Sequence, residues 1–317
     1  MKKMKKLNLL LGTLIATAAL SHAVDSYSDV VGYSKLSINQ GGRLVAPVFV
    51  KAAVYSGSST VTSGVFSASG LSGGALNQTA FSDRPNFPTH YVKVTSAGSY
   101  EGLVLDVVSN TATSVTVAGA PAGLTGSVSI QVIPHYTLLD LANQSADLAP
   151  YSDAVTFYDS GNNKRTYYYA GGSDGFVADD YSTPSGHVII DPGTGVILNA
   201  GGNSSITMTG VVNNKKTLVP VYAGESIVAP LDPSGISKVS DINLAPAIAA
   251  YSDAASVVLL NGSLATSTYY SDGTGMLDDG YNALDSSTSP VLAVGNGFII
   301  NAGADGIWVQ NPVISGN

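Results

Sequence analysis

The chain of 317 residues contains no cysteine and carries little charge. The absence of cysteine excludes disulfide bonds, thiolate metal sites and a lipid-modified cysteine. Only 11% of the residues are Asp, Glu, Lys or Arg, compared with roughly 25% in ordinary soluble domains. Disordered tails, coiled coils and nucleic-acid-binding modules carry much more charge, so the composition excludes these three classes.

Glutamate is nearly absent as well, because 20 of the 22 acidic residues are Asp and only Glu101 and Glu225 are Glu. Asp favours turns and helix caps, whereas Glu favours helix interiors. The 35 glycines and the many Ser, Thr and Val residues also favour strands and turns. We therefore predict an all-β protein with little helix, built from sandwich- or barrel-like units.

The first 23 residues have the pattern of a secretory signal peptide. Four lysines within residues 1–6 precede an apolar stretch at 7–20, and Ser21-His22-Ala23 fits a cleavage site. Removal of this segment leaves ten basic and 22 acidic residues, so the formal net charge falls from −8 to −12. We expect an acidic, exported protein in the periplasm, at the cell surface or outside the cell, with no membrane span and no nucleic-acid partner.

Several motifs occur twice, about 100 residues apart. Tyr-Ser-Asp-Ala begins at Tyr151 and again at Tyr251, and Gly-x-Gly followed by an apolar run and Asn-Ala-Gly occupies 193–201 and 295–303. Tyr-Tyr, Ser-Asp-Gly and Asp-Asp lie between these motifs in the same order in each half. Ordered matches at nearly one spacing indicate an internal duplication.

A weaker repeat upstream shows where the two halves differ. Leu44-Val-Ala-Pro47 parallels Ile227-Val-Ala-Pro230, but the first copy is followed by many more residues before the next shared motif. We interpret the chain as two homologous β units, 24–213 and 214–317, with an insert at about 50–133 in the first. Apolar runs separated by turn signals predict that the insert is a β-meander.

The meander is expected to use the runs at 91–95, 103–108 and 113–117. Helical patterns are few, and the two best are 137–143 and 242–250, each long enough for one or two turns. Both candidate helices lie outside the proposed insert. They leave the prediction of an all-β protein unchanged.

Several stretches resemble a family of exported, β-rich bacterial proteins of unassigned function that is associated with verrucomicrobial genomes. The resemblance lies in Asp29-Val-Val-Gly-Tyr33, His90-Tyr-Val-Lys-Val-Thr-Ser96 with Glu101-Gly102, Ser109-Asn-Thr-Ala112, Ile133-Pro-His-Tyr-Thr-Leu138, and the Pro/Val-Gly-x-Gly-hydrophobic segments at 192–198 and 294–300. Members often have Trp where Tyr136 and Phe176 stand in this chain. The resemblance implies export and a β-rich architecture, and it assigns no catalytic residues.

Clustered carboxylates between glycines make calcium the one ion that the sequence suggests. Ca²⁺ takes about six to eight oxygen ligands, and an exported acidic protein meets this ion readily. The candidate ligands in the two units are Asp174, Asp179, Asp180, Asp272, Asp278 and Asp279. Ser-Asp-Gly and Asp-Asp are also typical of hairpin turns, in which Asp accepts hydrogen bonds from nearby backbone. No other cofactor is indicated.

Tyrosines next to these carboxylates suggest a sugar site. A tyrosine ring can stack on a sugar, and a neighbouring carboxylate can accept hydrogen bonds from its hydroxyls. The candidates are Tyr168, Tyr169, Tyr181, Tyr269, Tyr270 and Tyr281. Consecutive residues on a strand point to opposite faces, so at most half of them can line one site. Tyrosine is also a common strand residue without any ligand.

Hydrolytic chemistry has the weakest support. Gly70-Leu-Ser-Gly-Gly74 matches G-x-S-x-G, but its flanks are Ser- and Gly-rich and lack the helix that a nucleophile elbow requires. The histidines beyond the signal segment are His90, His135 and His187, and no pair of them has metal-ligand spacing. A Ser-His-Asp triad would have to assemble from distant segments.

These observations lead to three hypotheses. The first is a non-enzymatic structural or interaction protein of the cell envelope or extracellular space, which binds other proteins or itself through strand edges. The second is a carbohydrate-binding protein that uses the Tyr- and Asp-rich loops. The third is a secreted hydrolase, which requires a histidine within hydrogen-bond reach of a serine and a carboxylate in a cleft.

Overall fold

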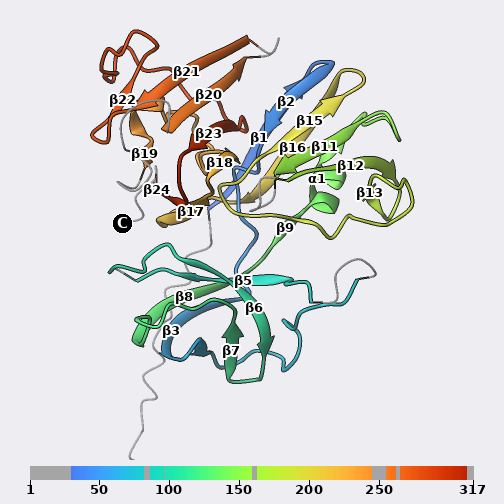
Figure 1. Cartoon of the computed structure of the whole chain (residues 1–317). Coiled ribbons are helices and arrows are strands. Elements are labelled where there is room, and N and C mark those ends of the chain that lie inside the picture. The colour runs from blue at the N-terminus through green and yellow to red at the C-terminus, as the bar shows by residue number, and fades with distance from the viewer. Residues whose placement is uncertain are drawn as a thin grey trace, which may run out of the picture.

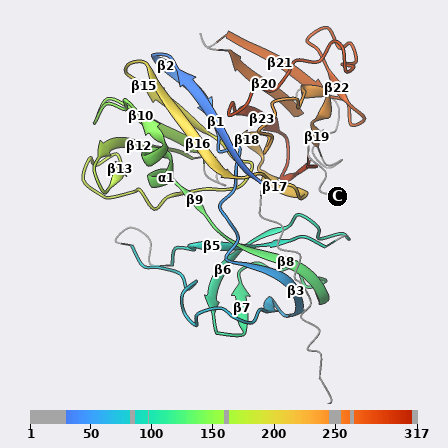
Figure 2. The ribbon, with the colours of Figure 1, turned by 180° about the vertical axis from the view of Figure 1, so that it is seen from behind.

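The computed structural model describes residues 30–81, 86–96, 98–158, 163–244, 255–261 and 265–312. This part of the chain is almost entirely strand and turn, as predicted, with one α-helix, α1 (Leu138–Gln144), and one 3₁₀ turn, η1 (Val239–Asp241). Figure 1 shows a small barrel on one side of two larger β units, and Figure 2 shows the same arrangement from behind. None of the helices in the described segments is long and apolar enough to cross a membrane.

The first unit is a sandwich of two sheets. The smaller sheet has the strand order β1 (Val31–Ile38), β16 (Ser204–Val211), β10 (Ser145–Ala146). The larger has the order β13 (Gly175–Val177), β12 (Lys164–Gly171), β11 (Ala154–Tyr158), β15 (Val196–Ala200), β2 (Gly41–Val45). A short pair, β9 (Tyr136–Thr137) and β14 (Ile189–Ile190), lies beside them. Ile38 and Ile206 from one sheet and Leu198 from the other are buried in the shared core.

The second unit has the same strand order in both of its sheets. The smaller sheet runs β17 (Thr217–Val221), β24 (Gly306–Gln310), β19 (Asn243–Leu244). The larger runs β18 (Gly224–Val228), β23 (Phe298–Ala302), β20 (Ala255–Asn261), β21 (Ala265–Ser271), β22 (Met276–Leu277). Phe298 and Trp308 pack edge to face in its core, with ring centroids 5.2 Å apart. The unit boundaries at 213 and 214 remain a prediction.

The two units join through the motifs that the sequence repeats. The chain after β2 pairs with the Gly-x-Gly turn of the second unit, and the chain after β18 pairs with the equivalent turn of the first. We call this the reciprocal contact. Its four main-chain hydrogen bonds run from Ala46 to Gly295 (3.0 Å), Gly297 to Leu44 (3.2 Å), Gly195 to Ile227 (3.0 Å) and Ala229 to Gly193 (2.9 Å).

Glycine is required at the centre of the reciprocal contact because the backbones approach closely. A Cβ atom on Gly195 would lie 3.0 Å from the Ile227 Cγ2 atom and 3.2 Å from the Val45 carbonyl oxygen. A Cβ on Gly297 would lie 3.2 Å from the Val228 carbonyl oxygen. The repeated Gly-x-Gly sequence therefore has a structural reason that the sequence alone does not reveal.

The insert forms a closed six-stranded barrel. Its order is β3 (Tyr55–Thr62), β4 (Val65–Ser67), β7 (Ser114–Val117), β6 (Val104–Asn110), β5 (His90–Val94), β8 (Gly126–Pro134), and β8 pairs back onto β3. The predicted meander corresponds to β5, β6 and β7, which pair in sequence order. Phe66, Val107 and Ile130 are fully buried and fill the interior with side chains.

The helix α1 begins where the barrel returns to the first unit. Thr137 caps it: the Asp140 amide donates to the Thr137 hydroxyl, and the Thr137 amide donates to the Asp140 carboxylate at 2.8 Å. The predicted helix at 137–143 is thus confirmed. In the second candidate, 242–250, Asn243 and Leu244 form β19, and the remaining residues from 245 onward lie outside the described segments.

Candidate functional site

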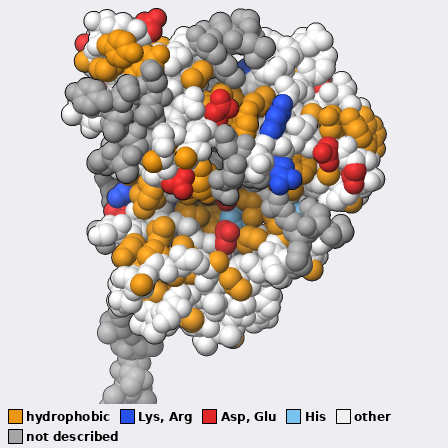
Figure 3. All heavy atoms as spheres, in the orientation of Figure 1, with side chains coloured by type: hydrophobic (Ala, Val, Ile, Leu, Met, Phe, Trp, Pro, Cys, Tyr) orange, Lys and Arg blue, Asp and Glu red, His pale blue; other side chains and the backbone are white. Residues whose placement is uncertain are grey.

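A cleft lies where the barrel meets both sandwich units. We call it the junction cleft; its volume is about 450 Å³. Figure 3 shows this hollow between the barrel and the two units, with histidine and acidic side chains at its edge. Each of the three parts contributes a carboxylate or an aromatic ring, including Phe87 and Asp106 beside and on the barrel, Phe157 and Asp191 of the first unit, and Tyr222 and Glu225 of the second.

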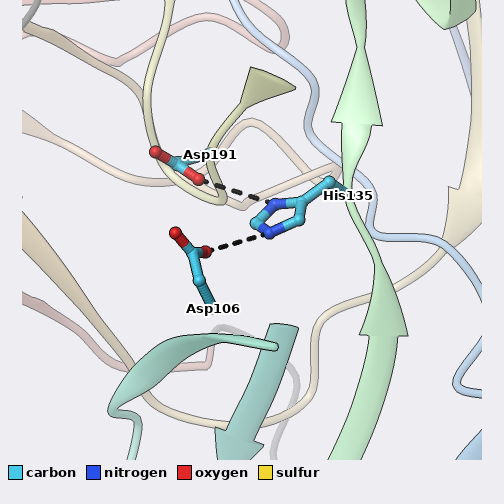
Figure 4. Close-up of side chains that lie close together, drawn as sticks. All are labelled: Asp106, His135 and Asp191. Atoms are coloured by element: carbon cyan, nitrogen blue, oxygen red, sulfur yellow. Dashed lines mark hydrogen bonds and ion pairs between the residues drawn. The ribbon is translucent and has the colours of Figure 1, made fainter. Parts of the chain in front are cut away.

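His135 lies between two carboxylates at this junction. It follows β8 directly, and only 1% of its side-chain surface is exposed. Its Nε2 atom is 3.1 Å from the Asp106 Oδ1 atom, and its Nδ1 atom is 3.6 Å from the Asp191 Oδ1 atom. Figure 4 shows both carboxylates directed toward the ring. The sequence analysis missed this group because its members lie on β6, after β8 and after β14.

Asp191 combines crowding with access to solvent. Protein atoms surround the carboxylate, while its side chain keeps 57% of its accessible surface toward the cleft. Removal from bulk water raises the pKa of Asp191, the Asp106 carboxylate raises it further, and His135 opposes the shift. Burial also raises the pKa of Tyr222, and Asp191 adds to that shift. The cleft therefore favours bound positive charge.

The other two histidines have different surroundings. The His90 Nδ1 atom is 2.8 Å from the Thr89 hydroxyl. Burial lowers the pKa of His90 to about 4, and the nearby His135 and Lys51 contribute. His187 stacks on Phe81 with ring centroids 3.8 Å apart. Since His135 contacts carboxylates and no hydrogen bond to a serine is seen for it in the described part of the chain, the geometry required of a hydrolase is not found there.

The candidate tyrosines divide between the two faces of their strands. Tyr169 and Tyr269 pack against the cores of their units. Tyr168 instead faces Tyr181, with ring centroids 4.5 Å apart, and Tyr270 stacks on Tyr281 at 5.3 Å with an interplanar angle of 21°. The structure therefore brings together one tyrosine pair in each unit. We call these two pairs the tyrosine platforms.

The outer tyrosine of each platform has an unusual backbone conformation. Tyr181 and Tyr281 have φ angles of 58° and 60°, in the left-handed region that glycine and asparagine occupy more easily. Both are exposed, at 51% and 61%. Each amide donates to the carbonyl three residues earlier, Ala178 in one unit and Asp278 in the other, both at 3.0 Å. The two turns are therefore equivalent.

This equivalence changes how the two Asp-Asp pairs align. Because Tyr181 matches Tyr281, Ala178 matches Asp278 and Asp180 matches Gly280. The sequence match of Asp179-Asp180 with Asp278-Asp279 is therefore offset by one residue in the structure. The carboxylates of the two units are consequently not in the same positions around the turns.

Three of the six candidate calcium ligands accept hydrogen bonds within their own turns. Asp180 accepts from the amides of Ser182 and Thr183, Asp272 from those of Thr274 and Gly275, and Asp278 from those of Gly280 and Asn282. Hydrogen bonds, chiefly from Thr183, Thr274 and Asn282, hold the pKa of these three carboxyls below the usual range. Asp174, Asp179 and Asp279 are exposed.

A second cavity, of about 520 Å³, lies beside the platform of the second unit. Tyr269, Tyr270, Asp278 and Asp279 line it together with Asn282. Among the described residues, the one group of three potential metal ligands is Asp106, His135 and Asp191, and none of the six candidate calcium ligands belongs to it. Calcium binding by those six residues remains a prediction.

Compared with family models, with curated proteins and with solved structures, the chain matches none. The resemblance to an exported bacterial family therefore stays a prediction. What the protein binds has to be argued from the chemistry of its own residues. The tyrosine platforms and the junction cleft are the two places where that chemistry is concentrated.

Proposed function

We propose that the protein is an exported, non-enzymatic binding protein whose tyrosine platforms hold carbohydrate. The observation that carries this proposal is the same exposed tyrosine pair at equivalent turns of both units, Tyr168 with Tyr181 and Tyr270 with Tyr281. Stacking on sugar rings uses exposed aromatic surface, and nearby polar groups supply orientation. Two separated platforms suit a polymer with repeating sugars.

The backbone at the outer tyrosines supports a binding role. A left-handed conformation costs a residue with a Cβ atom about 1–2 kcal/mol relative to its ordinary conformations. Gly or Asn would fit Tyr181 and Tyr281 at lower cost. Each turn nevertheless carries an exposed tyrosine that stacks on a strand tyrosine and contributes little to a core. Unusual backbone of this kind often occurs at ligand sites.

The charge near the platforms favours a neutral sugar. Asp179 and Asp180 adjoin Tyr181, and Asp278 and Asp279 line the cavity beside Tyr270. Hydrogen bonds from their turns keep Asp180 and Asp278 ionised. Carboxylates accept hydrogen bonds from sugar hydroxyls and repel anionic sugars. We therefore expect neutral polysaccharides to bind better than uronic-acid polymers.

Affinity electrophoresis of the full chain tests this proposal. Gels containing mannan, xylan or β-glucan should retard the wild type, and gels containing alginate should not. Replacement of Tyr181 and Tyr281 by Asn, which tolerates the left-handed conformation, should weaken retardation about tenfold while leaving the melting temperature nearly unchanged.

Tyr33→Asn is the matched control, since Tyr33 is 67% exposed and lies on β1, outside both platforms. This variant should be retarded like the wild type. Equal retardation of the Tyr181→Asn/Tyr281→Asn variant and the wild type, or failure of every neutral polysaccharide to retard the wild type, would refute the proposal.

A second candidate function is assembly through a strand edge. The strand β1 lies at the end of its sheet order, and Val31 and Tyr33 on it are 72% and 67% exposed. An edge strand with exposed apolar residues can pair with a strand of another chain. Light scattering on the native protein distinguishes the two: edge pairing predicts assemblies that Tyr33→Lys disperses, whereas a monodisperse monomer contradicts it.

A further inference from the structure

We propose that Asp106, His135 and Asp191 form a binding site for a divalent transition-metal ion such as Zn²⁺. The site lies in the junction cleft, apart from the tyrosine platforms and independent of the sugar-binding proposal. Its potential ligand atoms all lie within 4.8 Å of one another, as Figure 4 illustrates. The three residues come from the barrel, from the segment that follows it and from the first unit.

His135 provides the strongest argument. The residue is 2% exposed, and its Nδ1 atom is buried without a hydrogen-bond partner. A buried polar atom without a partner is uncommon, because it has lost its water and gained nothing in return. This atom is directed toward the Asp191 Oδ1 atom at 3.6 Å, which is too long for a hydrogen bond.

That separation suits two atoms that share a metal ion. Zinc binds imidazole nitrogen and carboxylate oxygen at about 2.0–2.2 Å in tetrahedral geometry, which places the two ligand atoms about 3.4 Å apart. The Nδ1 and Oδ1 atoms would need to move by only a few tenths of an ångström. Asp191 is accessible from the cleft, so an ion can reach it.

Asp106 completes the arrangement on the other side of the ring. Its Oδ1 atom lies 3.1 Å from Nε2, so it can accept the Nε2–H hydrogen bond and leave the Nδ1 lone pair free. This tautomer is inferred from the hydrogen-bond partners. Metal-binding histidines commonly donate their second N–H to a carboxylate, which fixes the ring and increases its basicity. Asp106 is thus a positioning residue, with a second oxygen close enough to become a ligand.

The charges around the site also favour a cation. Asp106 and Asp191 raise the energy of each other's ionised form, and Glu225 lines the same cleft. No Lys or Arg stands among the described residues that line it. A dication would relieve this repulsion. Remaining coordination positions would face the cleft and hold water.

The ligand set distinguishes the ion from calcium. Ca²⁺ prefers six to eight oxygen ligands, whereas imidazole nitrogen suits Zn²⁺ and its first-row neighbours. A site centred on His135 should therefore select Zn²⁺ over Ca²⁺. Binding would also connect the barrel with the first unit, because the ligands belong to both.

Isothermal titration of the full chain with Zn²⁺, after chelator treatment and dialysis, tests the proposal. We expect one equivalent to bind the wild type, and His135→Gln or Asp191→Asn to abolish that binding. Asp106→Asn should weaken it about 10–100-fold. Asp180→Asn, which changes an exposed carboxylate in a turn, is the matched control and should bind like the wild type.

Circular dichroism and melting curves establish that each variant is folded, and Asp191→Asn is the variant least able to disturb folding because its side chain is largely exposed. The proposal is wrong if the wild type binds no Zn²⁺ at millimolar concentration. It is equally wrong if folded Asp191→Asn and His135→Gln retain wild-type affinity. Ca²⁺ binding that matches Zn²⁺ in affinity and survives in His135→Gln would show that carboxylates alone hold the ion, and would overturn it too.

Discussion

At the scale of single residues, buried polar groups determine how the parts of this protein are held together. Asp153, from the repeated Tyr-Ser-Asp-Ala motif, is 1% exposed and accepts from the amides of Ala149 and Gly201 at 2.9 and 2.7 Å. Gly201 ends the other repeated motif of the first unit. One repeated motif therefore binds the other, which is a structural role.

Lys93 is the most deeply buried cation that the structure describes in the barrel. It lies on β5, is 2% exposed, and its Nζ atom donates to the Asn213 Oδ1 and Thr217 Oγ1 atoms at 2.6 and 2.7 Å. These contacts join the barrel to the segment between the two units. Burial lowers the pKa of Lys93 to about 7, and Lys215 contributes.

The lowered pKa predicts a stability that increases with pH. Between about pH 7 and 10.5 the unfolded chain binds a proton at Lys93 that the folded protein does not, so the free energy of unfolding rises across this window. The expected slope from this residue is about 1.4 kcal/mol per pH unit. Urea unfolding at pH 7, 8 and 9 should show this slope in the wild type and its loss in Lys93→Met.

Lys35→Met is the control for this experiment, because Lys35 lies exposed on β1. Its unfolding free energy should follow the wild-type pH dependence. Parallel pH profiles for the wild type and Lys93→Met would contradict the assignment of the slope to Lys93.

At the scale of elements, the reciprocal contact is the feature most sensitive to a small change. Gly195→Ala places a Cβ atom 3.0 Å from the Ile227 Cγ2 atom, so one backbone must move. Overpacking of this kind costs about 1–3 kcal/mol. Thermal or urea unfolding should show a loss of that size. Gly202→Ala, where nothing lies within 4 Å of the added atom, should change stability by less than about 0.5 kcal/mol.

Local elements could be predicted from the sequence because their signals are local. The β5, β6 and β7 strands follow from alternating apolar runs, and α1 follows from Thr137 and the apolar residues after it. Barrel closure could not be predicted in this way. It depends on β3 pairing with β8 and β4 with β7, contacts between distant segments that no local pattern specifies.

The candidate site shows the same limit. Parity along β12 and β21 correctly predicted that only one tyrosine of each adjacent pair could face a given site. The left-handed conformation of Tyr181 and Tyr281 had no signal, because glycine or asparagine would have been expected there. The Asp106, His135 and Asp191 group had none either, since its members are scattered among ordinary strand and turn sequence.

At the scale of the whole molecule, three separate hydrophobic cores lie in the barrel and the two units. Phe66 is fully buried in the barrel core, so Phe66→Ala should destabilise the barrel by about 3–5 kcal/mol. Hydrogen exchange should accelerate in β5 and β8 and stay unchanged in β23. Equal acceleration in all three parts would show that the cores unfold as one.

The reciprocal contact has a consequence for how such a molecule could arise. Each unit carries both partners of the contact, an apolar segment after β2 or β18 and a Gly-x-Gly turn before β15 or β23. A chain with one unit would therefore be self-complementary, and two copies could associate about a two-fold axis. Joined in one polypeptide, the halves become a covalently tethered pseudo-dimer that dilution cannot separate, with the barrel as the element that breaks its symmetry.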